Sequence, residues 1–101
     1  MLVEFSVIPI GGGRSLSGRV AKIIDIVDKS GLKYKLTDMG TIVEGSWDRV
    51  FSVIKKCHRQ VLKDSGRAYT RVVVDETRGR NRRISEKISA VEKKLGRAVK
   101  V

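Results

Sequence analysis

Two carboxylates, a hydroxyl and an indole are the side chains whose types and spacing point to ligand chemistry. Glu44 stands in a short apolar run, and Trp47 follows it by three residues. Glu4 and Ser6 alternate with apolar residues near the start of the chain. Carboxylates accept hydrogen bonds and balance positive charge, and an indole ring covers cations with its π face. These residues predict a site for a small cationic or amine-bearing ligand, although Trp47 also suits the role of a core anchor.

The other reactive residues predict no catalysis, no metal and no cofactor. Cys57 and His58 are neighbours on a predicted helix, where adjacent residues do not face one another. They therefore form neither a metal site nor a nucleophile and base pair. His58 falls on the apolar stripe of that helix, where a partly buried, hydrogen-bonded histidine is expected. The single cysteine excludes an internal disulfide and is typical of a reducing compartment.

The densest charge run lies between the last predicted strand and the last predicted helix, in a chain of formal net charge +11. It predicts an alternative function, the binding of nucleic acid or another anion. The side chains that would do this are Arg78, Arg80, Arg82 and Arg83. Abundant Lys, Arg and Glu beside one Asn and one Gln are also typical of a thermophilic protein.

The length of 101 residues and the apolar content of 41% predict a single domain over residues 1–101. No run approaches the roughly 18 consecutive apolar residues of a membrane span. The first residues lack the basic and apolar regions of a signal peptide. We therefore expect a cytoplasmic protein without a membrane partner.

Hydrophobic periodicity predicts four strands and three helices. The strands are expected at 2–8, 33–39, 41–45 and 67–77, and the helices at 16–30, 46–65 and 84–95. Pro9 is expected to end the pairing of the first strand, and Asp38 and Gly40 suit a turn between the second and third strands. This order is the split βαβ pattern, so we predict an α+β fold, a ferredoxin-like βαββαβ sandwich with an additional C-terminal helix.

In such a fold the first and third strands lie at the centre, and both helices cover the same face. Strand alternation places Glu4 and Ser6 on the open face. Glu44 would carry a large desolvation cost if it lay unpaired beneath two apolar helices, so it too is assigned to the open face. Arg71, Val73 and Asp75 of the fourth strand are expected there as well.

A face that is half apolar and half ionised is expected to meet a ligand, another subunit, or both. A simpler alternative is an interface in which the carboxylates pair with basic neighbours. RNA on the sheet is disfavoured, because the central strands show Glu4 and Glu44 instead of the aromatic residues on which bases stack.

Four segments carry a resemblance to a known family. The small thiamine-binding family is resembled by Val3-Glu4-Phe5-Ser6-Val7-Ile8-Pro9-Ile10-Gly11, Ser30-Gly31-Leu32-Lys33-Tyr34, Met39-Gly40-Thr41-Ile42-Val43-Glu44-Gly45 and the Lys-Lys-Cys-His run at 55–58. The resemblance implies a ferredoxin-like fold and non-catalytic binding of thiamine or its hydroxymethylpyrimidine moiety. It also implies homodimers that pair as homotetramers through their sheets. The ligand-binding residues that it implies by position are Ser6, Pro9, Gly40, Thr41 and Glu44, with Trp47 proposed as a wall of the site.

Overall fold

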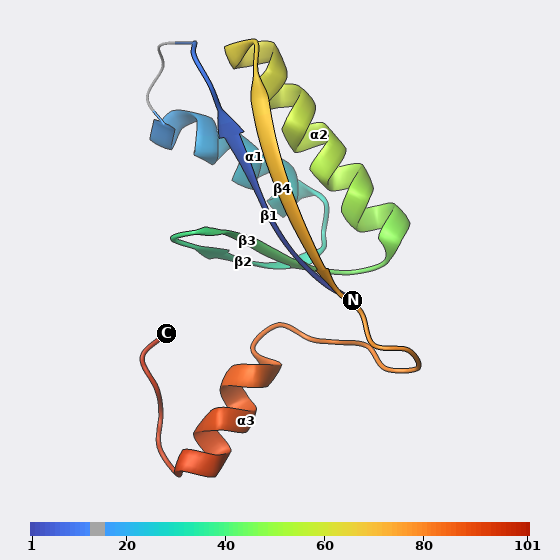
Figure 1. Cartoon of the computed structure of the whole chain (residues 1–101), viewed down its shortest axis with the longest axis vertical. Coiled ribbons are helices and arrows are strands. Elements are labelled where there is room, and N and C mark those ends of the chain that lie inside the picture. The colour runs from blue at the N-terminus through green and yellow to red at the C-terminus, as the bar shows by residue number, and fades with distance from the viewer. Residues whose placement is uncertain (13–15) are drawn as a thin grey trace.

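The computed structural model describes residues 1–12 and 16–101 (Figure 1). The elements run in the order β1 (Leu2–Pro9), α1 (Leu16–Lys29), β2 (Lys33–Thr37), β3 (Gly40–Glu44), α2 (Trp47–Ser65), β4 (Ala68–Asp75) and α3 (Glu86–Leu95). The fold is an α+β ferredoxin-like βαββαβ sandwich with an additional C-terminal helix, as predicted.

The four strands form one antiparallel sheet in the order β2-β3-β1-β4, which confirms the central position of β1 and β3. The helices α1 and α2 both cover the same face of this sheet (Figure 1). The strands differ in length, since β1 and β4 have eight residues each while β2 and β3 have five. As a result, the pairing of β1 with β3 ends at Phe5 and Thr41, while β1 and β4 remain paired for four more residues.

Pro9 ends β1, as predicted. It lies opposite Ala68 as the last residue of the β1–β4 ladder. The backbone N–H of Ile10 donates to the carbonyl of Arg67 at 3.0 Å, so even-numbered residues of β1 direct their backbone groups toward β4. Pro9 has no N–H, but as an odd-numbered residue it faces away from β4. The β1–β4 ladder therefore loses no hydrogen bond at Pro9.

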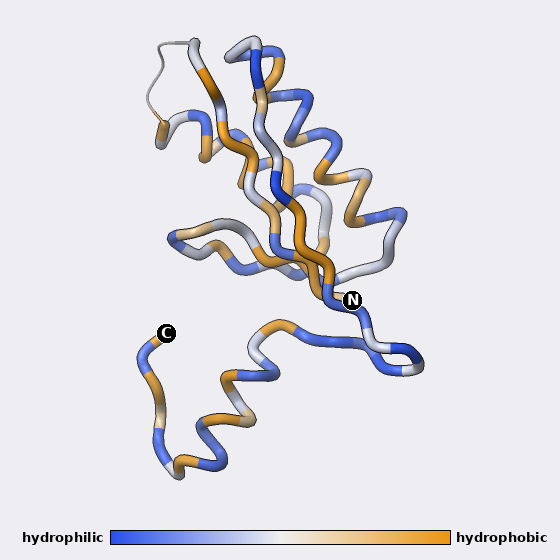
Figure 2. Tube along the Cα trace, viewed as in Figure 1, coloured by the Kyte–Doolittle hydropathy of each residue, from blue (hydrophilic) through white to orange (hydrophobic). Residues whose placement is uncertain are grey.

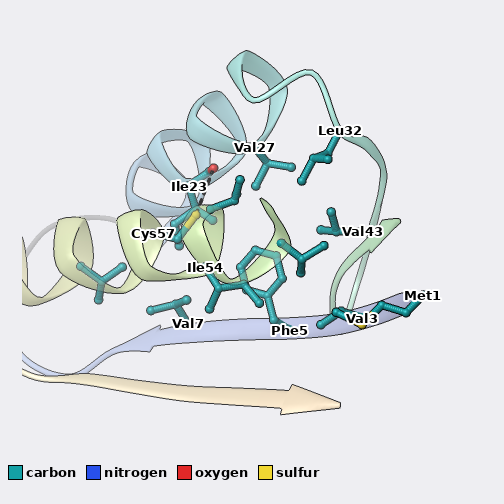
Figure 3. Close-up of a cluster of buried hydrophobic side chains, with 13 residues drawn as sticks. Met1, Val3, Phe5, Val7, Ile23, Val27, Leu32, Val43, Ile54 and Cys57 are labelled. Atoms are coloured by element: carbon teal, nitrogen blue, oxygen red, sulfur yellow. Dashed lines mark hydrogen bonds between the residues drawn. The ribbon is translucent and has the colours of Figure 1, made fainter. Parts of the chain in front are cut away.

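The core lies between the sheet and the two helices. Val3, Phe5 and Val7 point from β1 into the cluster of buried apolar side chains, where they meet α1 and α2 (Figure 3). The burial of these three side chains confirms the predicted helix-facing side of β1.

Ser46 caps α2, since its hydroxyl accepts from the N–H of Arg49 at 3.4 Å.

The opposite face of the sheet carries the predicted polar residues. Glu4 pairs with Ile42 on one side and with Val73 on the other, so these three side chains share the open face. The same register places Ser6 beside Arg71. The face assignment made from alternation and from desolvation is therefore correct.

The third helix, α3, stands away from the sheet (Figure 1). Apolar and charged residues alternate along it (Figure 2), and none of its side chains is buried. The Cα radius of gyration is 15.1 Å, whereas a compact chain of this length is expected near roughly 13 Å. The apolar stripe of α3 therefore has no cover from its own sheet. In the described part of the chain no helix is both long enough and apolar enough to cross a membrane.

Candidate functional site

Five of the six predicted ligand residues separate into two places, and Pro9 lines neither of them. Ser6, Gly40 and Thr41 line a cavity of about 180 Å³, which we call the β1-edge cavity. Glu44 and Trp47 line a second cavity of about 570 Å³, which we call the Glu44 cavity. Thr41 and Glu44 are about 10 Å apart along β3, at roughly 3.3 Å per residue. The structure does not gather the six residues into a single site.

The β1-edge cavity exists because β1 continues where β3 has not yet begun. Its walls are residues 5–8 of β1, residues 36–41 of the β2–β3 hairpin, and Val20, Ile23 and Ile24 of α1. Thr37 holds the hairpin turn, since its hydroxyl donates to the carbonyl of Gly40 at 3.0 Å and accepts from the N–H of Met39 at 3.3 Å. The turn thus closes the hairpin and leaves the last part of β1 without a β3 neighbour.

Gly40 allows the hairpin to approach β1 closely. A Cβ atom at this position would lie 2.9 Å from the carbonyl oxygen of Phe5 and 3.6 Å from Cγ of Glu4. The first distance is shorter than real Cβ contacts, so a larger residue would push β3 away from β1. The second distance shows that the side chain of Glu4 lies beside Gly40 on the open face, next to the cavity.

Two hydroxyl groups at the β1-edge cavity have no internal partner. Within residues 1–12 and 16–101, the side chains of Ser6 and Thr41 make no hydrogen bond. Thr41 is 5% exposed and comes from the helix-facing side of β3, while Ser6 comes from the open face of β1. Apolar walls with a few free polar groups are typical of small-molecule sites. At about 180 Å³, the volume suits one substituted ring.

At the Glu44 cavity the side chains of Glu44 and Trp47 already bind within the chain. Glu44 Oε1 accepts from the backbone N–H of Ile84 at 2.9 Å, which holds the segment leading into α3. The indole Nε1 of Trp47 donates to Glu76 Oε1 at 3.2 Å. Its ring stacks on Phe51, with centroids 5.0 Å apart and planes 9° from parallel. Trp47 is nevertheless 49% exposed. It is therefore not a buried core anchor.

The arginine run is partly neutralised by acids of the same chain. Arg80 forms an ion pair with Glu86. Arg82 lies 3.0 Å from Asp75 Oδ2 and 3.5 Å from Glu86 Oε1. The side chains of Arg78 and Arg83 form no ion pair in the described ranges. Two of the four predicted anion-binding residues, Arg80 and Arg82, thus form ion pairs that hold the loop in place.

Cys57 and His58 have structural roles. Burial in the core raises the pKa of the Cys57 thiol to about 11, so the thiol stays protonated at neutral pH and is a poor nucleophile. His58 Nδ1 lies 2.6 Å from the hydroxyl of Thr70 on β4, which confirms a hydrogen-bonded, half-buried histidine. Among the residues that the structure describes, no group of three or more His, Cys, Asp or Glu side chains is placed to hold a metal ion.

Comparison with known proteins identifies the class. The family model described as "Thiamine-binding protein" matches residues 3–92, and the chain belongs to this family. A UPF0045 protein of Methanocaldococcus jannaschii is 34% identical over 91 residues, which cover 90% of this chain and 91% of the relative.

Solved structures agree with this fold. A crystal structure of a hypothetical protein from Methanocaldococcus jannaschii matches with a TM-score of 0.81 and 34% identity, covering 89% of this chain and 93% of the other. A Thermotoga maritima protein proposed to act in thiamine biosynthesis or salvage matches with a TM-score of 0.78 and 23% identity. That match covers 89% of this chain and 96% of the other.

Proposed function

We propose that the chain is a non-catalytic, cytoplasmic binding protein that takes the pyrimidine moiety of thiamine in the β1-edge cavity. The observation that carries this proposal is the free pair of hydroxyls, from Ser6 and Thr41, in an apolar cavity of about 180 Å³. Membership of the thiamine-binding family supports the ligand class. The similarity to a protein proposed to act in thiamine biosynthesis or salvage supports it further.

The chemistry of the ligand suits the cavity. An aminopyrimidine is a flat ring that carries an amino donor and ring-nitrogen acceptors, so hydroxyl groups and backbone groups can recognise it. The apolar walls from α1 and β1 remove the faces of the ring from water. Pro9, at the end of β1, fixes the backbone beside the cavity without adding a free N–H.

For whole thiamine, the thiazolium ring extends onto the open face beside Gly40. The side chain of Glu4 lies there and supplies a negative charge next to the permanent cation. This assigns the counter-ion role to Glu4 in place of Glu44, whose carboxylate holds the N–H of Ile84.

The lining of the cavity favours binding over catalysis. Among its described lining residues, Asp38 alone carries an ionisable side chain. A serine acts as a nucleophile when an adjacent base activates it. Ser6 has no histidine or lysine beside it in this lining, so we assign it a hydrogen-bonding role.

A calorimetric titration with thiamine and with 4-amino-5-hydroxymethyl-2-methylpyrimidine tests the proposal. Both ligands should bind the wild type, and Ser6→Ala should weaken each by about two- to tenfold through loss of one hydrogen bond. The control is Ser52→Ala, an exposed serine on α2, which should bind like the wild type. Absence of heat with both ligands, or wild-type affinity in Ser6→Ala, would contradict the proposal.

We also propose that the chain self-associates, as a homodimer or homotetramer, through its uncovered apolar surfaces. Val73 on the open face is 54% exposed, and Val91 on α3 is 39% exposed. The open face also carries both Glu4 and Arg71, so two copies related by a twofold axis can pair opposite charges. A second copy therefore suits this surface in both apolar area and charge.

Sedimentation equilibrium tests self-association. The wild type should have a mass of two or four chains, and Val73→Glu or Val91→Glu should lower it by burying a charge at the interface. Ser89→Glu adds the same charge at an exposed position of α3 and serves as the control. A monomeric wild type would contradict this part of the proposal.

A further inference from the structure

Backbone groups of β1 alternate between its two neighbours. The N–H of Gly45 donates to the carbonyl of Met1 at 3.1 Å, on the β3 side. The N–H of Ile10 donates to Arg67 on the β4 side. Because successive residues of a strand direct their N–H and C=O groups to opposite sides, odd-numbered residues of β1 face β3 and even-numbered residues face β4.

Val7 is the residue at which this alternation leaves backbone groups unpaired. It follows Phe5 by two residues and directs its N–H and C=O the same way, but the β1–β3 register ends at Phe5. No other described residue hydrogen-bonds these two groups. Val7 is only 7% exposed and lines the β1-edge cavity. Buried backbone groups are nearly always paired, so this donor and acceptor are well placed for a ligand.

We propose that the N–H and C=O of Val7 read the aminopyrimidine edge of the ligand. The ring nitrogen next to the amino-bearing carbon accepts from the N–H of Val7, and the amino group donates to its carbonyl. The inference rests on the proposed function and names the specificity element of the same site. The ring occupies the place of the residue that a longer β3 would pair with Val7, since an antiparallel neighbour also exchanges one N–H and one C=O bond there.

This arrangement makes the pyrimidine the recognised part of thiamine. A ring without the amino group leaves the carbonyl of Val7 buried and unpaired, and sites built around such hydrogen bonds reject ligands that lack them. The thiazole part offers no adjacent donor and acceptor pair of this kind. Ligands of the site should therefore share an amino group next to a ring nitrogen.

Amide hydrogen exchange of the nitrogen-15-labelled protein tests the role of Val7. The probe is 4-amino-5-hydroxymethyl-2-methylpyrimidine, added at about one hundred times its measured Kd. Exchange at the N–H of Val7 should be fast in the free protein and slowed by up to about 100-fold with the probe. The N–H groups of Ser6 and Ile8 serve as internal controls, because their bonds to β4 should protect them in both states.

The outcomes separate this inference from the proposed function. Calorimetric binding of the probe without slowing at Val7 would overturn the inference and leave the proposed function standing. No binding at all would overturn both. Protection of Val7 that appears without ligand and grows with protein concentration would show strand pairing with a second copy, and it would also overturn the inference.

A ligand analogue provides a second arm that requires no mutation. The desamino ring, 5-hydroxymethyl-2-methylpyrimidine, keeps the acceptor for the N–H of Val7 and loses the donor to its carbonyl. It should bind about tenfold more weakly or worse, because the carbonyl stays buried without a partner. Equal affinity for the two rings would overturn the inference.

Discussion

The two ends of β3 differ in charge and in how their polar side chains are paired. At Gly40 and Thr41 the strand begins beside a small apolar cavity, where the hydroxyls of Ser6 and Thr41 have no partner in the described chain. At Glu44 it ends beside a larger, more charged cavity in which Glu44 already holds the N–H of Ile84. Under the proposed function, a few unpaired polar groups inside an apolar wall mark the ligand site, and the more charged cavity does not.

Of the changes at the two ends of β3, filling the β1-edge cavity should have the largest effect on pyrimidine affinity. Val20 lines this cavity from α1, and Val20→Phe places a ring in the proposed ligand volume. Overpacking costs of about 1–3 kcal/mol predict that pyrimidine binding weakens by roughly 5- to 150-fold. Leu62→Phe, at an exposed position of α2, is the control and should bind normally. Calorimetry measures both, and normal binding by Val20→Phe would place the ligand elsewhere.

Gly40→Ala should lower the stability of the fold at the edge of the β1-edge cavity. Its Cβ would lie 2.9 Å from the carbonyl of Phe5, so β3 must shift away from β1. We expect the free energy of unfolding to fall by about 1–3 kcal/mol. Urea denaturation followed by circular dichroism measures this loss. A variant as stable as the wild type would show that the close approach at Gly40 is not required.

Glu44→Ala should affect stability alone. The variant leaves the N–H of Ile84 without its acceptor, so unfolding should become easier by about 1 kcal/mol, and exchange of that amide should accelerate. Pyrimidine affinity should stay within about twofold of the wild type, a change too small for a lost ligand hydrogen bond. Glu44→Gln retains a carbonyl acceptor, so its free energy of unfolding is expected to lie between those of the wild type and Glu44→Ala. A large loss of affinity in either variant would place the ligand at the Glu44 cavity.

Salt should have the smallest effect. The pyrimidine is uncharged at neutral pH, so its affinity should change by less than about twofold when the salt concentration rises tenfold. Thiamine should weaken slightly more, because its cation meets the exposed carboxylate of Glu4. Calorimetric titrations at low and high salt measure both. A steep salt dependence that disappears in Arg83→Gln would favour the anion-binding alternative.

Periodicity was sufficient to predict the element order and the faces of the sheet. Val3 and Phe5 alternate with Glu4 and Ser6, which gave the two faces of β1. The desolvation cost of burying Glu44 gave the correct faces for the residues of β3. The turn near Asp38 was also predicted, from its turn-forming residue types. These features depend on local sequence and on burial, which alternation reports directly.

The separation of the predicted ligand residues into two cavities could not be predicted, because it depends on strand register. The β1-edge cavity follows from the four residues by which β1 continues beyond β3, and alternation does not report that length difference. The pairing of Arg82 with Asp75 and Glu86 left no such signal either, because Arg82 lies in the loop before α3 and Asp75 ends β4.

Fluorescence of Trp47 tests the central claim most directly, because it is the only tryptophan in the chain and lines the Glu44 cavity. Thiamine and its pyrimidine are titrated into the protein, with calorimetry on the same samples and excitation at the red edge of indole absorption. We predict heat of binding with unchanged Trp47 emission, because the ligand lies at the other end of β3. Quenching or a shift of Trp47 emission that follows the calorimetric curve would contradict the account and place the ligand beside Glu44.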